Sequence, residues 1–395
     1  MALNTVSSDR LSTNVKNTNF TAAEKQDLTD DILPLAGQLG NRNLIINGAM
    51  QVAQRGTSST ADGFGTVDRF QNVHTNTDEA PEQEQGAVAS GTTPYTSGFR
   101  KSFKITNGNQ TSGAGATDEL FIRTRLEAQD IANSGWNYTS SSSNITLSFW
   151  VKSSVAQNFF GRLTTNDGTA QNFPFETGSL SADTWTKITK TIPGNSNLTF
   201  NNDNGTGLSI EWSLFRGTDQ TGTVTLNQWA ASNSSARTPD QTSTWYTTND
   251  ATFELTGVQL EVGSVATDFE HRSFGQELDL CRRYYYNLAF QNTSGTQALF
   301  NGSGYDSSTI YHVCVLPTPM RAIPTIEQNT SGSYFQSYGN GGSNNYSTLN
   351  VDATQSTSIV EIYNSGTHSR GGGVSHFTRL NSATTDGKFC LTAEL

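Results

Sequence analysis

Cysteine and basic residues are scarce in this sequence of 395 residues, and long apolar runs are absent. The three cysteines, Cys281, Cys314 and Cys390, all fall in the last third of the chain. An odd number without paired spacing predicts neither a disulfide framework nor a zinc site, so we expect reduced, partly buried thiols. No stretch approaches the roughly 18 apolar residues that cross a bilayer, and we expect no membrane partner.

The chain carries 24 Lys and Arg against 35 Asp and Glu, which gives a net charge of -11. Proteins that bind nucleic acid through its phosphates gather Lys and Arg on one surface, and we therefore expect no nucleic-acid partner. The N-terminal stretch MALNTVSSDRLSTNVKNTNF lacks the basic start and the apolar core of a secretion signal. We expect the protein to be made and folded in a cytoplasm.

Glycine is abundant, with 36 residues, and hydrophobic residues reach 33%, below the usual ~45 to 50%. Aromatic residues stay at 10% and charged residues at 15%, which is unlike a disordered chain. Such a balance is typical of all-β proteins, in which polar faces and turns outnumber core positions. At roughly 100 to 200 residues per domain, the length favours two or three domains.

The stretch FTAAEKQDLTDDILPLAGQLG, residues 20–40, predicts one short helix. Thr21 and Glu24 form a capping box, and Pro34 ends the helical pattern. An apolar stripe on one side of this helix cannot be buried by the helix alone; it consists of Leu28, Ile32 and Leu33. The helix either folds back on its own domain or docks on another protein, and we assign residues 1–40 to an anchoring segment.

From about residue 43 to residue 272, apolar and polar residues alternate with a period of two. In ITLSFWVK, the residues Ile145, Leu147, Phe149 and Val151 share one face. The same alternation predicts these inward residues in three further strands: Phe99, Phe103 and Ile105; Leu120, Ile122 and Leu126; Leu208, Ile210, Trp212 and Leu214. Turn clusters separate the runs, so we predict an antiparallel β-sandwich over residues 41–272.

The last run of this region changes parity. Phe253 and Leu255 face one way, whereas Val258, Leu260 and Val262 have the opposite parity. Both sets can be buried only if the strand shifts its phase by one residue. A β-bulge at Thr256 and Gly257 would produce that shift, and we predict one there.

After Arg272 the sequence SFGQELDLCRRYYYN changes to helical spacing. The apolar positions of this predicted connector helix are Phe274, Leu278, Cys281 and Tyr285, and Asp279 can pair with Arg283 one turn on. The stretches YHVCVLPTPMRAIPTIEQ, SIVEIYN and GKFCLTAEL then read as strands. We therefore expect residues 273–395 to hold the connector helix and a smaller C-terminal β-domain.

Several stretches together resemble a family of bacteriophage and prophage tail-fibre or appendage proteins. They are NRNLIINGAMQVAQRGTS, VDRF, LSFWVKSS, TWTKITKTIPG, NDNGTGLSIEWSL, ATFELTGVQLEVGSVATDFEHRSFGQELDLCRRYYY and LPTPMRAIPTI, in that order over roughly residues 41–326. The resemblance implies a jelly-roll domain like a carbohydrate-binding module. It also implies a structural virion protein, homotrimeric, that joins other tail or capsid proteins and contacts polysaccharide on the host surface. The first 40 and last 70 residues fall outside it.

Related sugar-binding modules often hold a structural calcium ion between their first and last strands. In this sequence the first strand offers Asn47 and Gln51, which are amides, where a carboxylate would be a better ligand. Asp68 and Glu261 remain the candidate calcium ligands. No other cofactor is indicated.

Exposed aromatic rings are the candidate carbohydrate-binding residues, because sugars stack their C–H faces on such rings. Trp150 and Trp185 lie on the outward parity of their strands. Either a ligand covers these rings or a loop, the connector helix or a neighbouring subunit does. Trp136, Trp245 and Tyr246 are further candidates in loop-like stretches.

The run of Arg282, Arg283, Tyr284, Tyr285 and Tyr286 is a candidate interface, since Tyr and Arg are enriched in interface cores. These residues can join the sandwich to the C-terminal domain, lie at a subunit axis, or do both.

No carboxylate pair, nucleophile beside a histidine or metal cluster has a recognisable spacing, so we expect no enzyme activity. The sequence thus favours a structural phage protein, a tail fibre or appendage of the virion that binds host glycan. Two alternatives remain: a capsid-surface fibre or decoration protein without receptor binding, and a polysaccharide-degrading enzyme.

Overall fold

The computed structural model describes residues 41–290, 297–330, 333–339, 341–352, 356–365, 372–381 and 387–395. The chain separates into a unit of residues 1–43 and a unit of residues 44–395, and the architecture below is that of the second unit. The predicted N-terminal helix, with Leu28, Ile32 and Leu33, lies outside the described residues.

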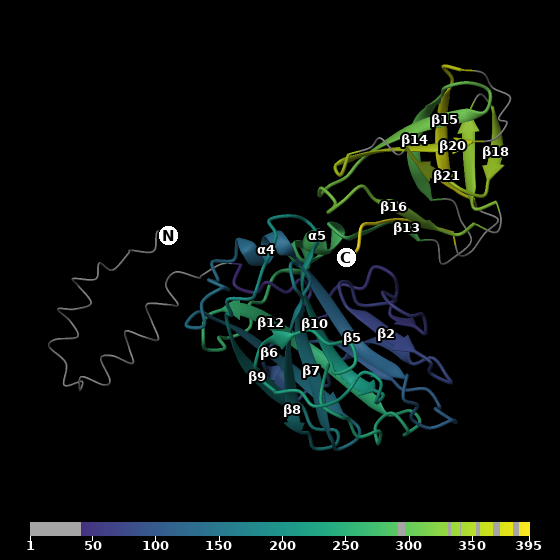
Figure 1. Ribbon diagram of the computed structural model, residues 1–395. Coiled ribbons are helices and arrows are strands. Elements are labelled where there is room, and N and C mark those ends of the chain that lie inside the picture. Colours follow the sequence, from purple (N-terminus) through teal and green to yellow (C-terminus); the bar gives the residue numbers. More distant parts are fainter. Residues whose placement is uncertain are drawn as a thin grey trace. The chain divides into compact units, whose positions relative to one another are not determined.

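Two antiparallel sheets of six strands each form the larger part of this unit (Figure 1). Sheet A runs in the order β1-β3-β4-β12-β6-β9, with strands Ser58–Ser59, Glu82–Ala87, Lys101–Thr106, Thr252–Val262, Asn144–Ser153 and Thr186–Pro193. Sheet B runs in the order β11-β8-β7-β10-β5-β2, with strands Ala230–Ala231, Gln171–Ser179, Asn158–Thr165, Thr206–Arg216, Glu119–Glu127 and Gln71–Thr75.

Eight of these strands follow the path of a long hairpin that has been rolled up. The first of the eight pairs with the last, β4 with β12, and the next pairs are β5 with β10, β6 with β9 and β7 with β8. Successive pairs alternate between sheet A and sheet B, which is the jelly-roll arrangement. The predicted all-β class and the jelly-roll sandwich are therefore confirmed.

Side chains from both sheets meet in one hydrophobic core. Phe149 of sheet A packs edge-on against Trp212 of sheet B, with ring centroids 5.6 Å apart. In the four strands first predicted, the inward residues are at most 4% exposed, and each contributes roughly 1.5 to 3 kcal/mol through burial. The prediction that Phe99 shares the sandwich core with Phe103 and Ile105 is wrong. Phe99 precedes β4, so strand parity does not apply to it, and it is buried in a separate cluster with Ala49 and Val88.

The predicted bulge is present in β12. Thr256 lies opposite Trp150 and Gln259 lies opposite Ser148, so β12 holds one residue more than β6 over this step. Gly257 takes the left-handed conformation, with φ of 62°, which glycine adopts without strain. Residues Phe253, Leu255, Val258 and Leu260 are all fully buried as a result, whereas Val262, at the end of the strand, is half-buried.

Helices are few and short in the described part of the chain, and none is long and apolar enough to cross a membrane. Two of them, α3 at Thr93–Thr96 and α4 at Ala128–Ala132, lie between sandwich strands. The connector helix α5 spans Phe274–Arg282 and begins with a capping box made by Ser273 and Gln276. It is shorter than predicted, because Tyr285 starts the next strand.

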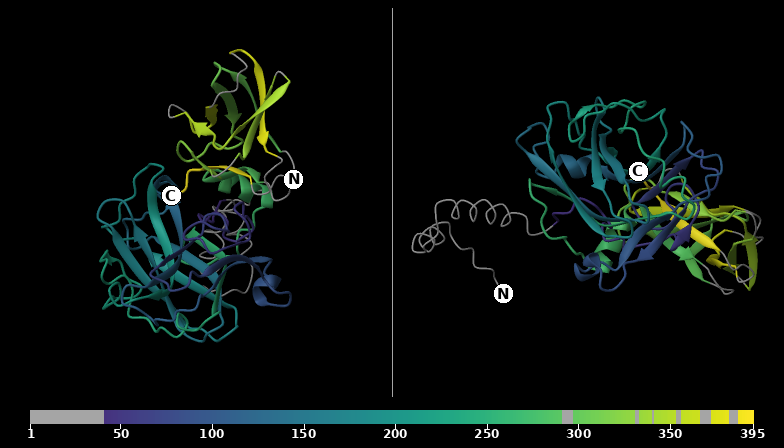
Figure 2. Two further views of the ribbon diagram at one scale, coloured as in Figure 1. Left: turned by 90° about the vertical axis from the view of Figure 1, so that its right-hand side faces the viewer. Right: turned by 90° about the horizontal axis from the view of Figure 1, so that it is seen from below.

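The C-terminal part consists of two antiparallel sheets. The strands β13 (Tyr285–Phe290), β22 (Lys388–Thr392) and β16 (Thr325–Gln328) form one, so the end of the chain, yellow in Figure 2, pairs with the strand after α5. The other runs β18-β17-β21-β14-β15-β20-β19, with strands Gly342–Tyr346, Phe335–Gly339, Ser375–Leu380, Ala298–Gly304, Thr309–Val315, Ile359–Ser365 and Asn350–Val351. They enclose a second hydrophobic cluster. All three cysteines are reduced and buried, more deeply than predicted.

Several buried polar side chains of the seven-stranded sheet lie within hydrogen-bond distance of one another. The Nε2 atom of His312, a residue that is 1% exposed, lies 3.1 Å from Thr378 Oγ1 and 3.4 Å from Asn364 Oδ1. Asn364 in turn donates to Ser337 Oγ at 2.9 Å. Burial is the main cause that lowers the pKa of His312 to about 4, and the nearby His376 acts in the same direction.

We predict that Gly257→Ala destabilises the sandwich more than Gly178→Ala does. Both glycines have positive φ, 62° and 73°, so each alanine carries a backbone penalty of about 1 kcal/mol. At Gly257 the new Cβ would also lie 2.7 Å from the Phe99 ring, whereas nothing lies within 4 Å at Gly178. Urea denaturation of both variants measures the difference, and equal losses would contradict the role of the close approach.

We predict that the C-terminal domain loses stability as the pH falls from about 6.5 to about 4. In this window the unfolded chain binds a proton at His312 that the folded chain excludes, so the free energy of unfolding drops by about 1.4 kcal/mol per pH unit. Hydrogen exchange of the amides of residues 309–315 at several pH values, corrected for the pH dependence of the intrinsic exchange rates, measures this change in the free energy of unfolding. His312→Gln should flatten the dependence, and His74→Gln in the sandwich should not.

Candidate functional site

Trp150 lies on the outer face of sheet A, as its parity predicts. It follows the buried Phe149 on β6, and it is directly opposite Lys187 of β9 on one side and Thr256 of β12 on the other. Trp150 is half-buried and Lys187 is exposed. An indole ring and an ammonium group therefore stand next to each other on this face.

A segment that follows β12, residues 264–271, lies over part of the same face. Glu261 accepts hydrogen bonds from the backbone N–H of Thr267 at 2.9 Å and from its hydroxyl at 2.6 Å. The side-chain oxygen of Gln259 accepts a bond from the backbone N–H of Glu270 at 2.8 Å. Gln259 and Glu261 are almost fully buried by this arrangement, which fixes the segment in place.

Three rings connect this segment with the turn before β4. Phe99 packs edge-on against Phe269 at 4.8 Å and lies 5.2 Å from His271, while Phe269 and His271 are 4.9 Å apart. The Nε2 atom of His271 lies 2.9 Å from the carbonyl oxygen of Ser97. Gly257 makes room for Phe99 at this point, so the bulge and the aromatic wall depend on each other.

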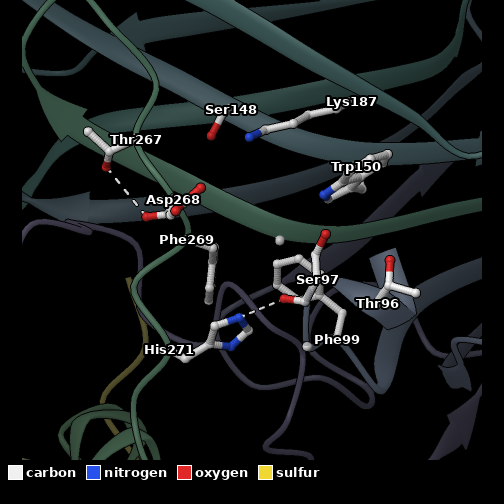
Figure 3. Close-up of a pocket in the computed structure, with 12 residues that line it drawn as sticks. Thr96, Ser97, Phe99, Ser148, Trp150, Lys187, Thr267, Asp268, Phe269 and His271 are labelled. Carbon is white, nitrogen blue, oxygen red and sulfur yellow. Dashed lines mark hydrogen bonds between the residues drawn. The ribbon is translucent and has the colours of Figure 1, made fainter. Parts of the chain in front are cut away.

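These parts enclose a hollow of about 490 Å³, which we call the outer-face hollow. It is lined by Thr96, Ser97, Gly98, Phe99, Ser148, Trp150, Lys187, Gly257, Thr267, Asp268, Phe269 and His271. Figure 3 shows Ser148, Trp150 and Lys187 on one side and Phe99, Phe269 and His271 on the other. Aromatic walls with a few hydroxyl, ammonium and carboxylate groups can hold a polar ligand that has apolar faces.

Trp185 lies on the same face of sheet A, outside the lining of the hollow. The ammonium of Lys152 is 5.3 Å from the centre of the Trp185 ring and forms an ion pair with Glu254 at 2.7 Å. Glu254 also accepts a bond from Ser102 at 2.8 Å. The ring of Trp185 is half-buried, and the cation beside it is itself held in place.

The three candidate aromatics in loop-like stretches are core residues, and this corrects the sequence analysis. Trp136 is 3% exposed and donates to the carbonyl of Ser143, while Trp245 is fully buried. Tyr246 is also fully buried and stacks on Phe215 at 4.4 Å. Burial raises the pKa of Tyr246, and its hydroxyl bonds Asp118. These rings present no free face, because the loops fold inward to close the ends of the sandwich.

The predicted interface run contacts the sandwich at Glu127, the last residue of β5. Arg283 binds both Glu127 oxygens, at 2.6 and 2.7 Å, and the hydroxyl of Tyr284 donates to Glu127 at 2.6 Å. Burial works against ionisation of Glu127, but the bonds from Arg283 and Tyr284 outweigh it and lower its pKa. Asp279 pairs with Arg282 at 3.0 Å, which corrects the predicted pair with Arg283.

Two further arginines of the sandwich stack on the tyrosine run. The guanidinium of Arg69 lies 3.5 Å from the centre of the Tyr284 ring, and that of Arg55 lies 3.5 Å from that of Tyr285. Both arginines also form ion pairs with Glu394, which follows β22. Arg282 lies 5.2 Å from the Tyr286 ring. The run therefore joins the sandwich to the C-terminal strands; a role at a subunit axis stays a prediction.

The two candidate calcium ligands each bond protein donors. Asp68 is buried and accepts bonds from the backbone N–H of Gln54 at 2.9 Å and from its amide; burial raises the pKa of Asp68 to about 6. Glu261 holds Thr267, as described above. In the described ranges, no group of three or more His, Cys, Asp or Glu residues is arranged to hold a metal. Calcium binding stays a prediction.

Sequence reasoning missed most of the lining of the outer-face hollow. Lys187 shares the outward parity of Trp185 within TWTKITK, and that signal would have placed it on the same face as Trp185, although it would not have given its pairing with Trp150. Asp268, Phe269 and His271 stand in an aperiodic stretch, VATDFEHRS, whose position over sheet A has no sequence signal of its own.

No protein-family model and no curated protein matches the sequence. Among solved structures, a family 11 carbohydrate-binding module from Clostridium thermocellum, in complex with a mixed-linked tetrasaccharide, is similar with 11% identity and a TM-score of 0.25 over 53% of this chain and 98% of its own. The N-terminal cellulose-binding domain of a Cellulomonas fimi β-1,4-glucanase is similar with 10% identity and a TM-score of 0.26, over 55% of this chain and 99% of its own.

An arabinose-bound α-L-arabinofuranosidase is similar with 10% identity and a TM-score of 0.29. The likeness covers 56% of this chain but only 26% of that enzyme. With all three TM-scores this low, the jelly-roll assignment rests on the strand pairing described above. The resemblance to phage appendage proteins stays a prediction.

We predict that Thr267→Val loosens the segment over sheet A. The change removes the hydroxyl that donates to Glu261 at 2.6 Å and leaves a buried carboxylate with one bond fewer, at a cost of about 1 to 3 kcal/mol. Hydrogen exchange should become faster in residues 264–271. Thr189→Val, on the same face and exposed, is the control, and equal rates in both variants would contradict the pinning role of Glu261.

Proposed function

We propose that this protein is a structural component of a phage virion, a tail fibre or appendage, whose jelly-roll domain binds glycan on the host cell surface. The observation that carries the proposal is the half-buried ring of Trp150 in the outer-face hollow, beside the exposed Lys187. Sugars stack their C–H faces on such rings, and ammonium, hydroxyl and carboxylate groups bond their hydroxyls. The volume of about 490 Å³ lies within the range of roughly 300 to 1,000 Å³ for small-ligand sites.

Binding is proposed without hydrolysis. The lining of the outer-face hollow contains one carboxylate, that of Asp268, whereas glycoside hydrolysis generally uses two that flank the scissile bond. The imidazole of His271 faces the backbone of Ser97. The chemistry of the lining is therefore suited to holding a sugar and not to cleaving it.

The virion part of the proposal rests on the resemblance of residues 41–326 to phage appendage proteins. On that basis residues 1–40 attach the protein to the tail or capsid, and three chains assemble into one appendage. Three copies of a shallow site would bind a cell surface far more tightly than one, because linked sites raise the effective ligand concentration.

We predict that Trp150→Ala weakens binding to bacterial cells and to their purified surface polysaccharide by about tenfold, through loss of the stacking surface. The measurement is a binding titration of fluorescently labelled protein, residues 1–395, with the cells and with the polysaccharide. Lys187→Ala should also weaken binding, whereas Trp185→Ala, outside the lining, should keep most of the affinity. Circular dichroism of each variant checks that the sandwich is intact.

Two results would contradict the proposal. If folded, assembled protein binds no cell of any host, the chain is better explained as a capsid decoration or spacer. If the protein releases reducing sugar from purified polysaccharide, it is an enzyme.

A further inference from the structure

Two tryptophans on the outer face of sheet A each have a lysine as a neighbour, and the two lysines differ. Lys152 lies 5.3 Å from the centre of the Trp185 ring and forms an ion pair with Glu254 at 2.7 Å. Lys187 lies opposite Trp150 in the strand pair. Within the described residues, the ammonium of Lys187 forms no ion pair and does not lie over an aromatic ring. The outer-face hollow therefore contains a positive charge that no residue of the described chain pairs with.

A buried hydroxyl group lies on the same side of the hollow. Ser148 is two residues before Trp150 on β6, so it shares the outward face, and it is only 3% exposed. Its side chain lines the hollow together with Lys187, as Figure 3 shows. In the part of the chain that the structure describes, the hydroxyl of Ser148 has no hydrogen-bond partner. A hydroxyl buried this deeply is expected to bond water or a ligand, since leaving it unbonded costs free energy.

The indole N–H of Trp150 is a third group of this kind. Trp150 is half-buried and lines the hollow, and among the described residues nothing accepts a hydrogen bond from its Nε1 atom. By contrast, the ring nitrogens of the buried Trp136 and Trp245 donate to backbone carbonyls at 3.1 and 3.0 Å. We call Ser148, Trp150 and Lys187 the donor group, because each of these side chains can donate a hydrogen bond.

We propose that the donor group binds an acidic group of the glycan, so that the outer-face hollow selects sugar chains that carry a carboxylate or a sulfate. This inference rests on the glycan-binding function proposed above. An ionised acidic group has only acceptor oxygens, and neighbouring positions of β6 and β9 offer it two neutral donors and a cation. A sugar hydroxyl would accept from one of these donors and leave the charge of Lys187 without a counter-charge.

One carboxylate, that of Asp268, also lines the hollow. Asp268 belongs to the segment that lies over sheet A and has further interactions within the chain, whereas the donor group belongs to β6 and β9. The charge of Asp268 would repel an acidic group that came close to it. The ligand should therefore place its acidic group on the donor group and direct its hydroxyl groups toward residues 264–271.

The net charge of -11 does not prevent this preference. At physiological ionic strength, charges on a protein surface are screened over roughly 8 Å, so the groups that touch the ligand decide the outcome. Lys187 is exposed, and exposed ion pairs are weak. We therefore expect a preference of about fivefold for the acidic ligand.

The test is a titration of the protein, residues 1–395, with two matched pairs of sugar chains. One pair is oligogalacturonate and its carboxyl-reduced form, and the other is dextran sulfate and dextran. The acidic member of at least one pair should bind about fivefold more tightly than its neutral partner. The pair that responds distinguishes a carboxylate ligand from a sulfate ligand, and added salt should reduce the preference.

Three variants show whether Lys187 causes the preference. Lys187→Met keeps the length of the side chain but removes its charge, and it should lower the affinity for the acidic member to that for the neutral member. Lys187→Arg keeps the charge and should keep the preference. Lys104→Met is the matched control, because Lys104 lies on the same sheet but outside the hollow, where it pairs with Glu84 at 3.0 Å. It removes the same charge and should leave the preference unchanged.

Two outcomes overturn the acidic preference and leave the proposed glycan binding in place. In the first, both members of each pair bind equally, and in the second, Lys187→Met weakens both members by the same factor. If neither pair binds but a bacterial polysaccharide does, that polysaccharide is titrated before and after carboxyl reduction and desulfation, and an unchanged affinity overturns the preference. If no polysaccharide and no bacterial cell binds, the proposed function itself has failed.

Discussion

One inserted residue at Gly257 determines both sides of sheet A. Before the bulge, Phe253 and Leu255 point into the core, and after it Val258 and Leu260 do the same. Without the insertion, a one-residue change of parity would place Gln259 and Glu261 in the core and the apolar residues outside. With it, Gln259 and Glu261 reach the outer face, where they hold residues 264–271 and so form one wall of the outer-face hollow. The hydrophobic core and the candidate site thus depend on the same backbone irregularity.

The charges at the start of the C-terminal part are structural. Glu127 is fully buried and would be costly alone, but Arg283 and Tyr284 satisfy both of its oxygens. Arg55 and Arg69 extend this arrangement, because each stacks on a tyrosine and pairs with Glu394. Such pairs specify one geometry, since any shift would leave a buried charge without its partner. The tyrosine run after α5 is therefore occupied by arginines of the same chain.

Strand parity made most of the sandwich predictable, because one buried face imposes a period of two. It placed Phe149 inside and Trp150 outside, and the same rule located the bulge. Parity has no meaning in loops, so the prediction that Trp136 and Trp245 are available to bind a sugar was wrong, because both are core residues. The partner of Arg283 is 156 positions away, at Glu127, so local helical spacing suggested Asp279 instead. The lining from residues 267–271 was missed for the same reason, since its place depends on bonds to Gln259 and Glu261 and not on local pattern.

The charge of the outer-face hollow bears on specificity. The hollow carries the cation of Lys187 and one carboxylate, that of Asp268, within a protein of net charge -11. A single shallow contact of this kind holds a sugar weakly. In the proposed assembly of three chains, linked binding raises the affinity by about 10² to 10⁴ over one site. The hollow therefore needs to be neither deep nor tight for attachment to be selective.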